Sequence, residues 1–293
     1  MSAQKKYILV INPISGDVDK TEIISQTEAF AKDLKIDLVT YKTTGDNDEA
    51  EINSLYKKHK PERVLVAGGD GTIKMVAEAL DSVDVIIGIL PAGSANGLSV
   101  DLNIPSELEE SLKIAFHSDF MEVDMICINN RKSLHLSDIG LNAELIKNYE
   151  NSSIRGKLGY AIQAVNTLTD TEVPFHTTIV ANGETIETEA KMVVIANSQK
   201  YGTGVVINPV GKMDDGKFEI VIIKNLDLLV FGKIITGNMP LDSGDVEIIS
   251  AEKATIKTDV PVHFQVDGEY CDEVTSLDIS MLPRQMKVAV PNS

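Results

Sequence analysis

The chain has 293 residues, with 44 acidic against 27 basic side chains and a formal net charge of −17. Apolar residues make up 43% and charged residues 24%, a globular composition with enough material for one large or two modest domains. The acidic charge argues against nucleic-acid binding, because phosphate contacts need clustered Lys and Arg. It also disfavours simple electrostatic attraction to anionic lipid.

Apolar runs and cysteines narrow the class of protein further. No apolar run reaches the ~20 residues that a membrane-spanning helix needs, and the stretch before Val10 is too short for a signal peptide. Cys127 and Cys271 form no disulfide framework and have no His nearby in sequence, and the five histidines lack zinc-ligand spacing. We therefore expect a cytoplasmic protein without a transmembrane segment.

The first part of the chain alternates short β-branched runs with helical patterns. Helical spacing of apolar residues begins at Ile23 and again at Ile73, and Ser106 with Glu109 predicts a capping box that opens a further helix. The predicted strands are Tyr7–Ile11, Ile36–Tyr41, Arg63–Ala67 and Val85–Leu90. Such alternation predicts a doubly wound parallel α/β sheet.

After about residue 120 the pattern indicates mostly β-structure. One amphipathic helix is predicted over 158–168, and Asn182-Gly183 predicts a hairpin between two strands. The further predicted strands are Lys191–Ala196, Phe218–Ile223, Asp245–Ser250, Val262–Val266 and Leu277–Met281. Short strands separated by turn residues favour an antiparallel sandwich. We therefore expect an α/β domain over 1–124 and a β-sandwich domain over 125–282.

The sharpest local feature is the glycine loop Gly68–Thr72, placed between a predicted strand and a predicted helix. Its glycines leave room for a large anion, and the N-terminus of the following helix attracts phosphate. Asp70 repels phosphate, so it fits a metal partner or a base near the transferred group. The alternative is a plain tight turn with Thr72 as the helix N-cap.

Two further loops follow predicted strands, Asn12–Gly16 and Pro91–Gly97. In an open α/β sheet, ligands bind beyond the carboxyl ends of the strands. All three loops lie at such ends, so we expect them to converge on one crevice.

Two acidic turns stand out in the second half of the chain. Gln265–Glu269 places Asp267 and Glu269 around a glycine, and Lys212–Lys217 contains Asp214 and Asp215. Adjacent carboxylates can hold a hard cation, although such turns are more often simply solvated.

Taken in order, these motifs resemble the diacylglycerol kinase and sphingosine kinase catalytic domain superfamily over nearly the whole chain. The loop 68–72 is similar to its GGDGT motif, and 12–16 to its NPxSG motif. The other matching segments are Thr44–Asp46, Pro91–Asn96, Asp124, Ile139–Glu144, Lys157–Tyr160, Tyr201–Gly204 with Pro209, Asp214–Gly216 and Asp267–Glu269. Three features depart from the pattern: Gly97 stands where diacylglycerol kinases usually have Asp, the first loop continues with Asp17 and lacks the second glycine often seen there, and Asp138 stands where a small residue is common.

The resemblance implies an α/β nucleotide domain and a β-sandwich domain, with the active site in the cleft between them. It also implies that the last segment, 283–293, returns to the first domain. The implied reaction is transfer of the γ-phosphoryl group of ATP, with Mg²⁺, to the hydroxyl of diacylglycerol or a related lipid. Transient contact with a membrane surface follows from such a substrate, and a homodimer is compatible with it.

The resemblance also assigns roles to residues. Asp70 is the leading candidate for the group that deprotonates or orients the attacking hydroxyl, and Glu269 with Asp267 is the alternative base or the Mg²⁺ ligand. Phosphate cradling falls to Gly68, Gly69, Gly71 and Thr72, and nucleotide contact to Asn12, Ser15, Thr44, Gly93, Ser94 and Asn96. Asp124 and Glu144 are assigned to the lipid side, and Asp214 with Asp215 to a structural cation. Lys20, Arg155 and Lys157 are candidate counter-charges for phosphate, with solvated surface side chains as the alternative.

Two other classes of function stay open. An NAD kinase or a sugar kinase of the phosphofructokinase type shares a glycine-rich GGDG loop, but the Asn-Glu or Asn-Asp motif of NAD kinases has no convincing counterpart in this sequence. A non-catalytic nucleotide or lipid binder on the same fold is the third hypothesis. The retention of Asp70, Asp267 and Glu269 argues against it.

Overall fold

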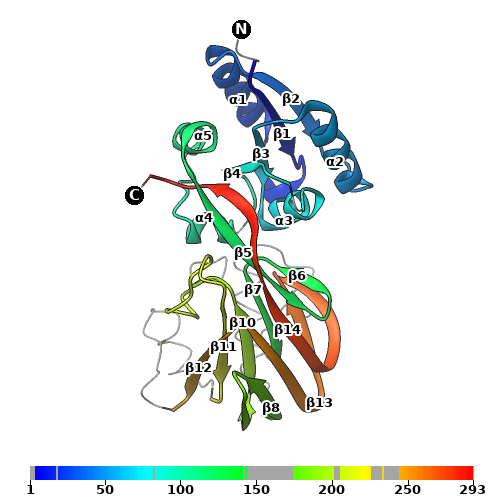
Figure 1. The fold of residues 1–293 in the computed structure, drawn as a ribbon, viewed down its shortest axis with the longest axis vertical. Coiled ribbons are helices and arrows are strands. Elements are labelled where there is room, and N and C mark those ends of the chain that lie inside the picture. Colours follow the sequence, from blue (N-terminus) through cyan, green and yellow to red (C-terminus); the bar gives the residue numbers. More distant parts are fainter. Residues whose placement is uncertain are drawn as a thin grey trace. The chain divides into compact units, whose positions relative to one another are not determined.

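The computed structural model describes residues 4–17, 19–81, 83–94, 96–140, 174–200, 205–225 and 244–292, with Ala143 and Lys233 as single residues. The chain divides into two units, Met1–Val123 with Arg284–Ser293 and Asp124–Pro283 (Figure 1). Each unit has a hydrophobic core of its own, around Leu9, Leu65 and Phe116 in the first and Ile139, Phe218 and Phe264 in the second.

The first unit contains the predicted parallel sheet. Its strands are β1 (Lys6–Ile11), β2 (Asp37–Lys42), β3 (Arg63–Gly68) and β4 (Ile86–Pro91), in the order β2-β1-β3-β4. All four predicted strands are confirmed to within one residue at each end. β1 pairs with β2 on one side and with β3 on the other, so the direction of winding reverses between β1 and β3. A ligand site is expected at the carboxyl end of this switch point.

Helices connect these strands. They are α1 (Thr21–Asp33), α2 (Asp48–His59), α3 (Asp70–Ala79), α4 (Gly97–Asp101) and α5 (Leu108–His117), with a 3-10 turn at Ser15–Asp17. The predicted apolar stripes are confirmed in α1, which buries Ile23, and in α3, which buries Ile73 and Val76. Helix α2 has no counterpart among the predicted elements, because it buries only Asp48 and Ile52 and has almost no apolar stripe.

The predicted capping box at α5 is wrong by one residue. The helix begins at Leu108, and the carboxylate of Glu107 accepts hydrogen bonds from the backbone N–H groups of Glu109 and Glu110. Glu107 has extended backbone angles and fills the capping position, so Ser106 lies outside the helix. A Glu side chain is long enough to cap the first turn itself, which the Ser-x-x-Glu pattern did not reveal.

The C-terminal strand β14 (Glu269–Ala289) completes the sheet of the first unit. Lys287 and Val288 lie parallel to Ile86 and Ile87 of β4, and the N–H of Val290 donates to the carbonyl of Asp119 at 3.1 Å. Asp119 immediately precedes β5 (Phe120–Ile128), which pairs with β14. The last residues of the chain thus belong to the same sheet as the first.

The second unit is antiparallel among its described strands. β12 (Val246–Ala251), β11 (Phe218–Ile223), β10 (Met192–Ala196), β7 (Leu136–Gly140) and β13 (Lys253–Val266) are neighbours in that order, with β6 (Arg131–Ser133) beside β5. β13 pairs with β7 through Phe264 and with β8 (Phe175–Ala181) through Ile256. It begins nine residues before the predicted strand, because a register shift between Lys257 and Val262 spans the interruption at Pro261.

The predicted hairpin is confirmed between β8 and β9 (Glu184–Ala190). Asn182 and Gly183 have φ angles of 53° and 80°, as a two-residue hairpin turn with both central residues at positive φ requires. The predicted helix over 158–168 and the motif segments 141–142, 144–160 and 201–204 lie outside the described residues. No helix of the described chain is long and apolar enough to cross a membrane.

Candidate functional site

The three glycine loops of the first unit meet, as the sequence predicts. A Cβ atom on Gly16 would lie 2.7 Å from the carbonyl carbon of Gly93, and one on Gly93 would overlap the Cα of Gly69. Gly16 also has a φ of 64°, which disfavours a side chain. The loops therefore pack backbone against backbone, and a side chain at any of these positions would separate them.

Hydrogen bonds join the same loops. The Asn12 Nδ2 donates to the Thr72 Oγ1 at 3.1 Å, and the Ser15 hydroxyl donates to the carbonyl of Ala92 at 3.0 Å. The N–H of Ala92 donates to the carbonyl of Gly68 at 2.9 Å. The predicted nucleotide residues Asn12 and Ser15 thus hold the other two loops in place.

Lys20 is an interior member of this cluster. Its side chain is buried, with the whole residue only 5% exposed, and its ammonium donates to the carbonyls of Ser15 at 2.7 Å and Ala92 at 2.8 Å. The alternative of a solvated surface lysine is therefore wrong. Lys20 joins the loop 12–16 to the loop 91–97 and adds a fixed positive charge beside both. The other two candidate counter-charges, Arg155 and Lys157, lie outside the described residues.

Asp70 is the first residue of α3 and connects it to α4. Its carboxylate accepts hydrogen bonds from the backbone N–H groups of Gly97 at 2.8 Å and Leu98 at 3.0 Å. The N-cap of α3 is Gly69, so the alternative in which Thr72 caps this helix is wrong. Among the described residues, a Cβ on Gly71 would find nothing within 4 Å, which leaves open space at the start of α3. That space suits an anion at a helix N-terminus.

Asn96 and Ser94 belong to the loop that follows β4. The Asn96 side chain accepts from the N–H of Gly93 at 2.7 Å and donates to the carbonyl of the same residue at 3.0 Å. Asn96 adopts a φ of 53°, a conformation that Asn tolerates better than most residues. Ser94 is exposed.

Thr44 lies in a turn held by Asp48, a residue that the sequence analysis did not single out. The Asp48 carboxylate accepts from the N–H groups of Thr44 at 2.9 Å and Gly45 at 2.8 Å, and from the Tyr41 hydroxyl at 2.6 Å. The N–H of Thr43 donates to the carbonyl of Ile11, which places this turn beside the start of the first glycine loop. The sequence signal for this turn is an Asp four residues after Thr44, because an Asp at the start of a helix commonly accepts hydrogen bonds from nearby backbone N–H groups.

Burial and hydrogen bonding in this turn shift two pKa values. Burial alone would raise the pKa of Asp48, but hydrogen bonds from Tyr41, Thr44 and Gly45 together lower it. Burial, and then the hydrogen bond and charge of Asp48, raise the pKa of the Tyr41 phenol to about 12. Asp48 is therefore ionised and Tyr41 neutral at physiological pH.

In the second unit, the two acids of the turn 266–269, Asp267 and Glu269, have different surroundings. The Asp267 carboxylate accepts from the Ser133 hydroxyl at 3.0 Å and from the N–H groups of Leu134 and His135 at 3.0 Å and 2.9 Å. Glu269 is exposed. Asp267 thus anchors the turn to the segment before β7, and Glu269 is the carboxylate that solvent and ligands can reach.

Asp124 lies against the other acidic turn. It is 1% exposed, its N–H donates to the carbonyl of Met213 at 2.8 Å, and its carboxylate accepts from the N–H of Gly216 at 2.8 Å. Asp214 and Asp215 are both exposed. Within the described part of the chain, no group of three or more His, Cys, Asp or Glu side chains could hold a metal ion. Glu144 lies outside the described residues.

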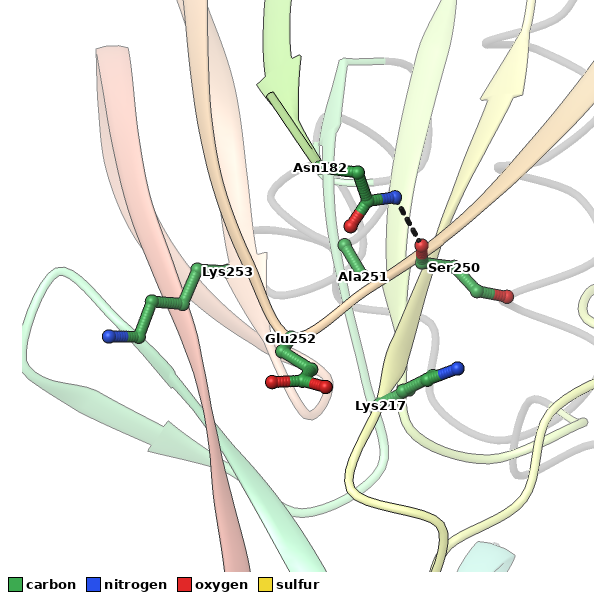
Figure 2. Close-up of a pocket in the computed structure, with 6 residues that line it drawn as sticks. All are labelled: Asn182, Lys217, Ser250, Ala251, Glu252 and Lys253. Atoms are coloured by element: carbon green, nitrogen blue, oxygen red, sulfur yellow. Dashed lines mark hydrogen bonds between the residues drawn. The ribbon is translucent and has the colours of Figure 1, made fainter. Parts of the chain in front are cut away.

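A hollow of about 530 Å³ in the second unit contains none of the predicted site residues. Its lining includes Lys217, Lys253, Glu252 and Asn182, and the Asn182 amide donates to the carbonyl of Ser250 (Figure 2). The two lysine side chains point away from each other, so they do not form a convergent site for an anion (Figure 2).

Comparisons with known proteins agree with this arrangement. The family described as diacylglycerol kinase catalytic domain matches residues 6–128, and the YegS C-terminal NAD kinase beta sandwich-like domain matches residues 138–290. The chain belongs to this family of diacylglycerol kinase-type catalytic domains with a YegS-type C-terminal domain. The resemblance and the fold class stated from the sequence are thereby confirmed.

Individual relatives cover almost the full length. A Salmonella typhimurium protein named "Probable lipid kinase YegS" is 26% identical, and the alignment covers 97% of this chain and 95% of that protein. A Bacillus anthracis structure described as a putative diacylglycerol kinase aligns over 98% of this chain and 97% of its own, with a TM-score of 0.81 and 24% identity. A diacylglycerol kinase structure from the same organism aligns with a TM-score of 0.75 and 20% identity, over 99% and 98% of the two chains. At these identities the structures establish a shared fold.

Proposed function

We propose that the protein is a lipid kinase, which transfers the γ-phosphoryl group of ATP to a lipid hydroxyl in a Mg²⁺-dependent reaction. The observation that carries this proposal is the packing of Gly16, Gly69 and Gly93 against one another at the carboxyl ends of the parallel strands. Family membership and the names of full-length relatives support the substrate class.

The nucleotide phosphates are proposed to bind the glycine loops. Gly68, Gly69, Gly71 and Thr72 cradle them at the N-terminus of α3, where open space at Gly71 and the helix dipole favour an anion. The proposed nucleotide contacts are Asn12, Ser15, Thr44, Gly93, Ser94 and Asn96. Phosphoryl transfer depends mainly on positioning and on neutralisation of charge, which a rigid cluster of loops serves well.

A carboxylate is proposed to accept the proton of the attacking hydroxyl. The lipid oxygen forms a bond to the γ-phosphorus, the bond to the bridging oxygen breaks, and ADP leaves as the second product. Asp70 and Glu269 are the two candidates for orienting or deprotonating the hydroxyl. Asp70 is held rigidly by α4, and Glu269 is exposed on a turn that Asp267 anchors.

Magnesium would neutralise the charge of the transferred phosphoryl group. Glu269 offers the exposed carboxylate oxygens that this cation prefers, with Asp267 as the residue that fixes its turn. The exposed pair Asp214 and Asp215 is the proposed position of a separate structural cation.

Diacylglycerol or a related lipid alcohol is the proposed acceptor. Asp124 and Glu144 are the proposed residues on the lipid side, and transient contact with a membrane surface would deliver the substrate. With a net charge of −17, such contact needs a local surface that differs from the average of the chain.

A radiolabelled-ATP screen tests the proposal. The acceptor panel contains diacylglycerol, monoacylglycerol, an undecaprenol-like alcohol, phosphatidylglycerol and sphingoid bases, with NAD and sugar phosphates as separate arms. We expect label in a lipid product and none in NAD or sugar products. Labelled NADP or sugar bisphosphate instead would refute the lipid kinase, and binding of ATP without any transfer would indicate a non-catalytic relative.

A further inference from the structure

We propose that Asp138 is a positioning residue that holds the turn carrying Glu269, acting through the side-chain amide of Gln265. This inference rests on the proposed function, because the turn matters for catalysis only if Glu269 takes part in phosphoryl transfer. Asp138 departs from the family pattern, and Gln265 is its partner on the neighbouring strand.

Strand pairing brings the two side chains together. Gln265 of β13 is the antiparallel partner of Asp138 of β7, and the residues are 1% and 0% exposed. In Figure 1, β7 and β13 belong to the sheet of the second unit. Burial on neighbouring strands removes water as a partner for either group. Both polar atoms of the Gln265 amide are then held by protein partners.

The direction of the hydrogen bonds fixes the amide. The N–H of Gly268 donates to the Gln265 Oε1 at 2.7 Å. Because a backbone N–H can only donate, the side-chain atom that faces it must be the amide oxygen. The Nε2 of the same amide must then point the opposite way, where it donates to the Asp138 Oδ2. Position 138 therefore has to offer an acceptor, and a carboxylate oxygen does so.

The consequence reaches Glu269 through the backbone. Asp267 and Gly268 have φ angles of 50° and 87°. Glycine adopts such an angle freely, whereas Asp267 is in a region that a side chain disfavours, so contacts that hold Asp267 stabilise the turn. The Asp267 carboxylate holds one side of the turn through Ser133, Leu134 and His135, and Gln265 holds the other through Gly268. Glu269 follows directly, is exposed, and is the antiparallel partner of Val266, so its position is set by this strand pairing together with the two anchors and not by packing of its own side chain.

Three variants test this chain of contacts. Gln265→Glu keeps the shape but places a second carboxylate against Asp138, so we expect kcat to fall about tenfold. When Asp138→Asn is added, the new amide at position 138 donates to the new carboxylate at position 265, so the hydrogen bond forms again with donor and acceptor exchanged. The kcat of the double variant should therefore return to within about threefold of wild type. Asp138→Asn alone can turn its amide oxygen toward Gln265, so it should also stay within about threefold. Asp278→Asn, an exposed change elsewhere on β14, is the matched control.

A second readout does not depend on catalysis. Hydrogen–deuterium exchange of the peptide spanning 264–271 should be faster in Gln265→Glu and normal in the double variant, and the KM for ATP should be unchanged in both. If Gln265→Glu does not fold, Gln265→Met takes its place with the same expected direction. Wild-type kcat and exchange in the Gln265 variants, or a folded double variant that recovers neither, would overturn the proposal. Absence of lipid kinase activity in the wild-type protein would instead refute the proposed function.

Discussion

The carboxylate of Asp70 accepts a hydrogen bond from the backbone N–H of Gly97 at 2.8 Å, across 27 residues of sequence. The second oxygen accepts from Leu98, so one side chain caps α4 while standing at the start of α3. The acid at the centre of the glycine motif therefore has a structural task in addition to the chemical one proposed for it.

Asp70→Asn separates these two tasks. An amide accepts only one of the two backbone hydrogen bonds, so we expect a loss of about 1 kcal/mol in the free energy of unfolding. We also expect kcat for lipid phosphorylation to fall more than about a hundredfold, because the amide cannot accept a proton. Asp33→Asn, an exposed change at the end of α1, is the control. Turnover near that of wild type would exclude Asp70 from the chemistry.

Substitution of Glu269 should lower activity without changing stability, whereas substitution of Asp267 should lower stability. Glu269→Gln removes an exposed carboxylate, so kcat should fall more than about a hundredfold with an unchanged melting temperature. Asp267→Asn weakens the anchoring of Leu134 and His135, so it should cost about 1–3 kcal/mol of stability. Parallel thermal melts and kinetics measure both. Loss of stability in the Glu269 variant alone would reverse the assignment.

Lys20→Met tests the buried ammonium that joins the glycine loops. The carbonyls of Ser15 and Ala92 lose this donor, so the free energy of unfolding should fall by about 2 kcal/mol. The KM for ATP should rise about tenfold with little change in kcat, because the loops are the proposed site of nucleotide binding. Lys32→Met, an exposed lysine of α1, should change neither quantity. A normal KM in a stable Lys20 variant would refute the role in nucleotide binding.

Acid should remove the stability that Asp48 provides. Its pKa is lowered in the folded protein, so its contribution is present above the ordinary Asp value near 4 and is lost as pH falls through the folded value. Asp48→Asn should therefore melt at a lower temperature than wild type at pH 7. The difference should shrink in strong acid. A difference that grows on acidification would contradict the lowered pKa.

Tyr41 provides the matching alkaline test. Its pKa is raised to about 12, so its favourable contribution is intact below the ordinary Tyr value near 10 and is lost as pH rises through about 12. The absorbance difference between wild type and Tyr41→Phe reports this ionisation. Ionisation of Tyr41 near pH 10 would show that Asp48 does not hold the phenol.

Removal of divalent metal distinguishes the two proposed cation positions. EDTA should abolish phosphoryl transfer, and added Mg²⁺ should restore it, because the proposed role of the cation is to neutralise the transferred group. If Asp214 and Asp215 hold a structural cation, EDTA should also lower the melting temperature, and a variant with both acids changed to Asn should not respond. Full activity in EDTA would remove the metal from the reaction.

Local sequence patterns were sufficient for the four predicted strands of the first unit, because these are short, mostly apolar and bounded by turn residues such as Gly, Pro and Asn. The convergence of Asn12–Gly16, Gly68–Thr72 and Pro91–Gly97 follows from parallel strand order alone, and the structure confirms it. Prediction failed at the start of α5, where Glu107 caps the helix in place of Ser106. It also missed α2, which has almost no apolar stripe.

The roles of individual acids and lysines required the fold. Asp267 and Glu269 are two residues apart and look equivalent in the sequence, yet one is held by three residues of a segment more than 130 positions away and the other is exposed. Lys20 lies in a charged stretch typical of a surface, yet the approach of two loops buries it. Periodicity reports neighbours along the chain, whereas these contacts join residues far apart in it.

The sequence by itself determined the fold class, the family and the glycine loops, because strand alternation and short motifs are local properties that survive without coordinates. Only the tertiary structure decided that Asp70 caps α4, that Lys20 is interior, and that Gln265 connects Asp138 to Gly268. Each of these depends on hydrogen bonds between distant segments, whose direction and burial are set when the strands pair. The net charge of −17 excludes classes of ligand, but the position of each charge in the fold determines what it does.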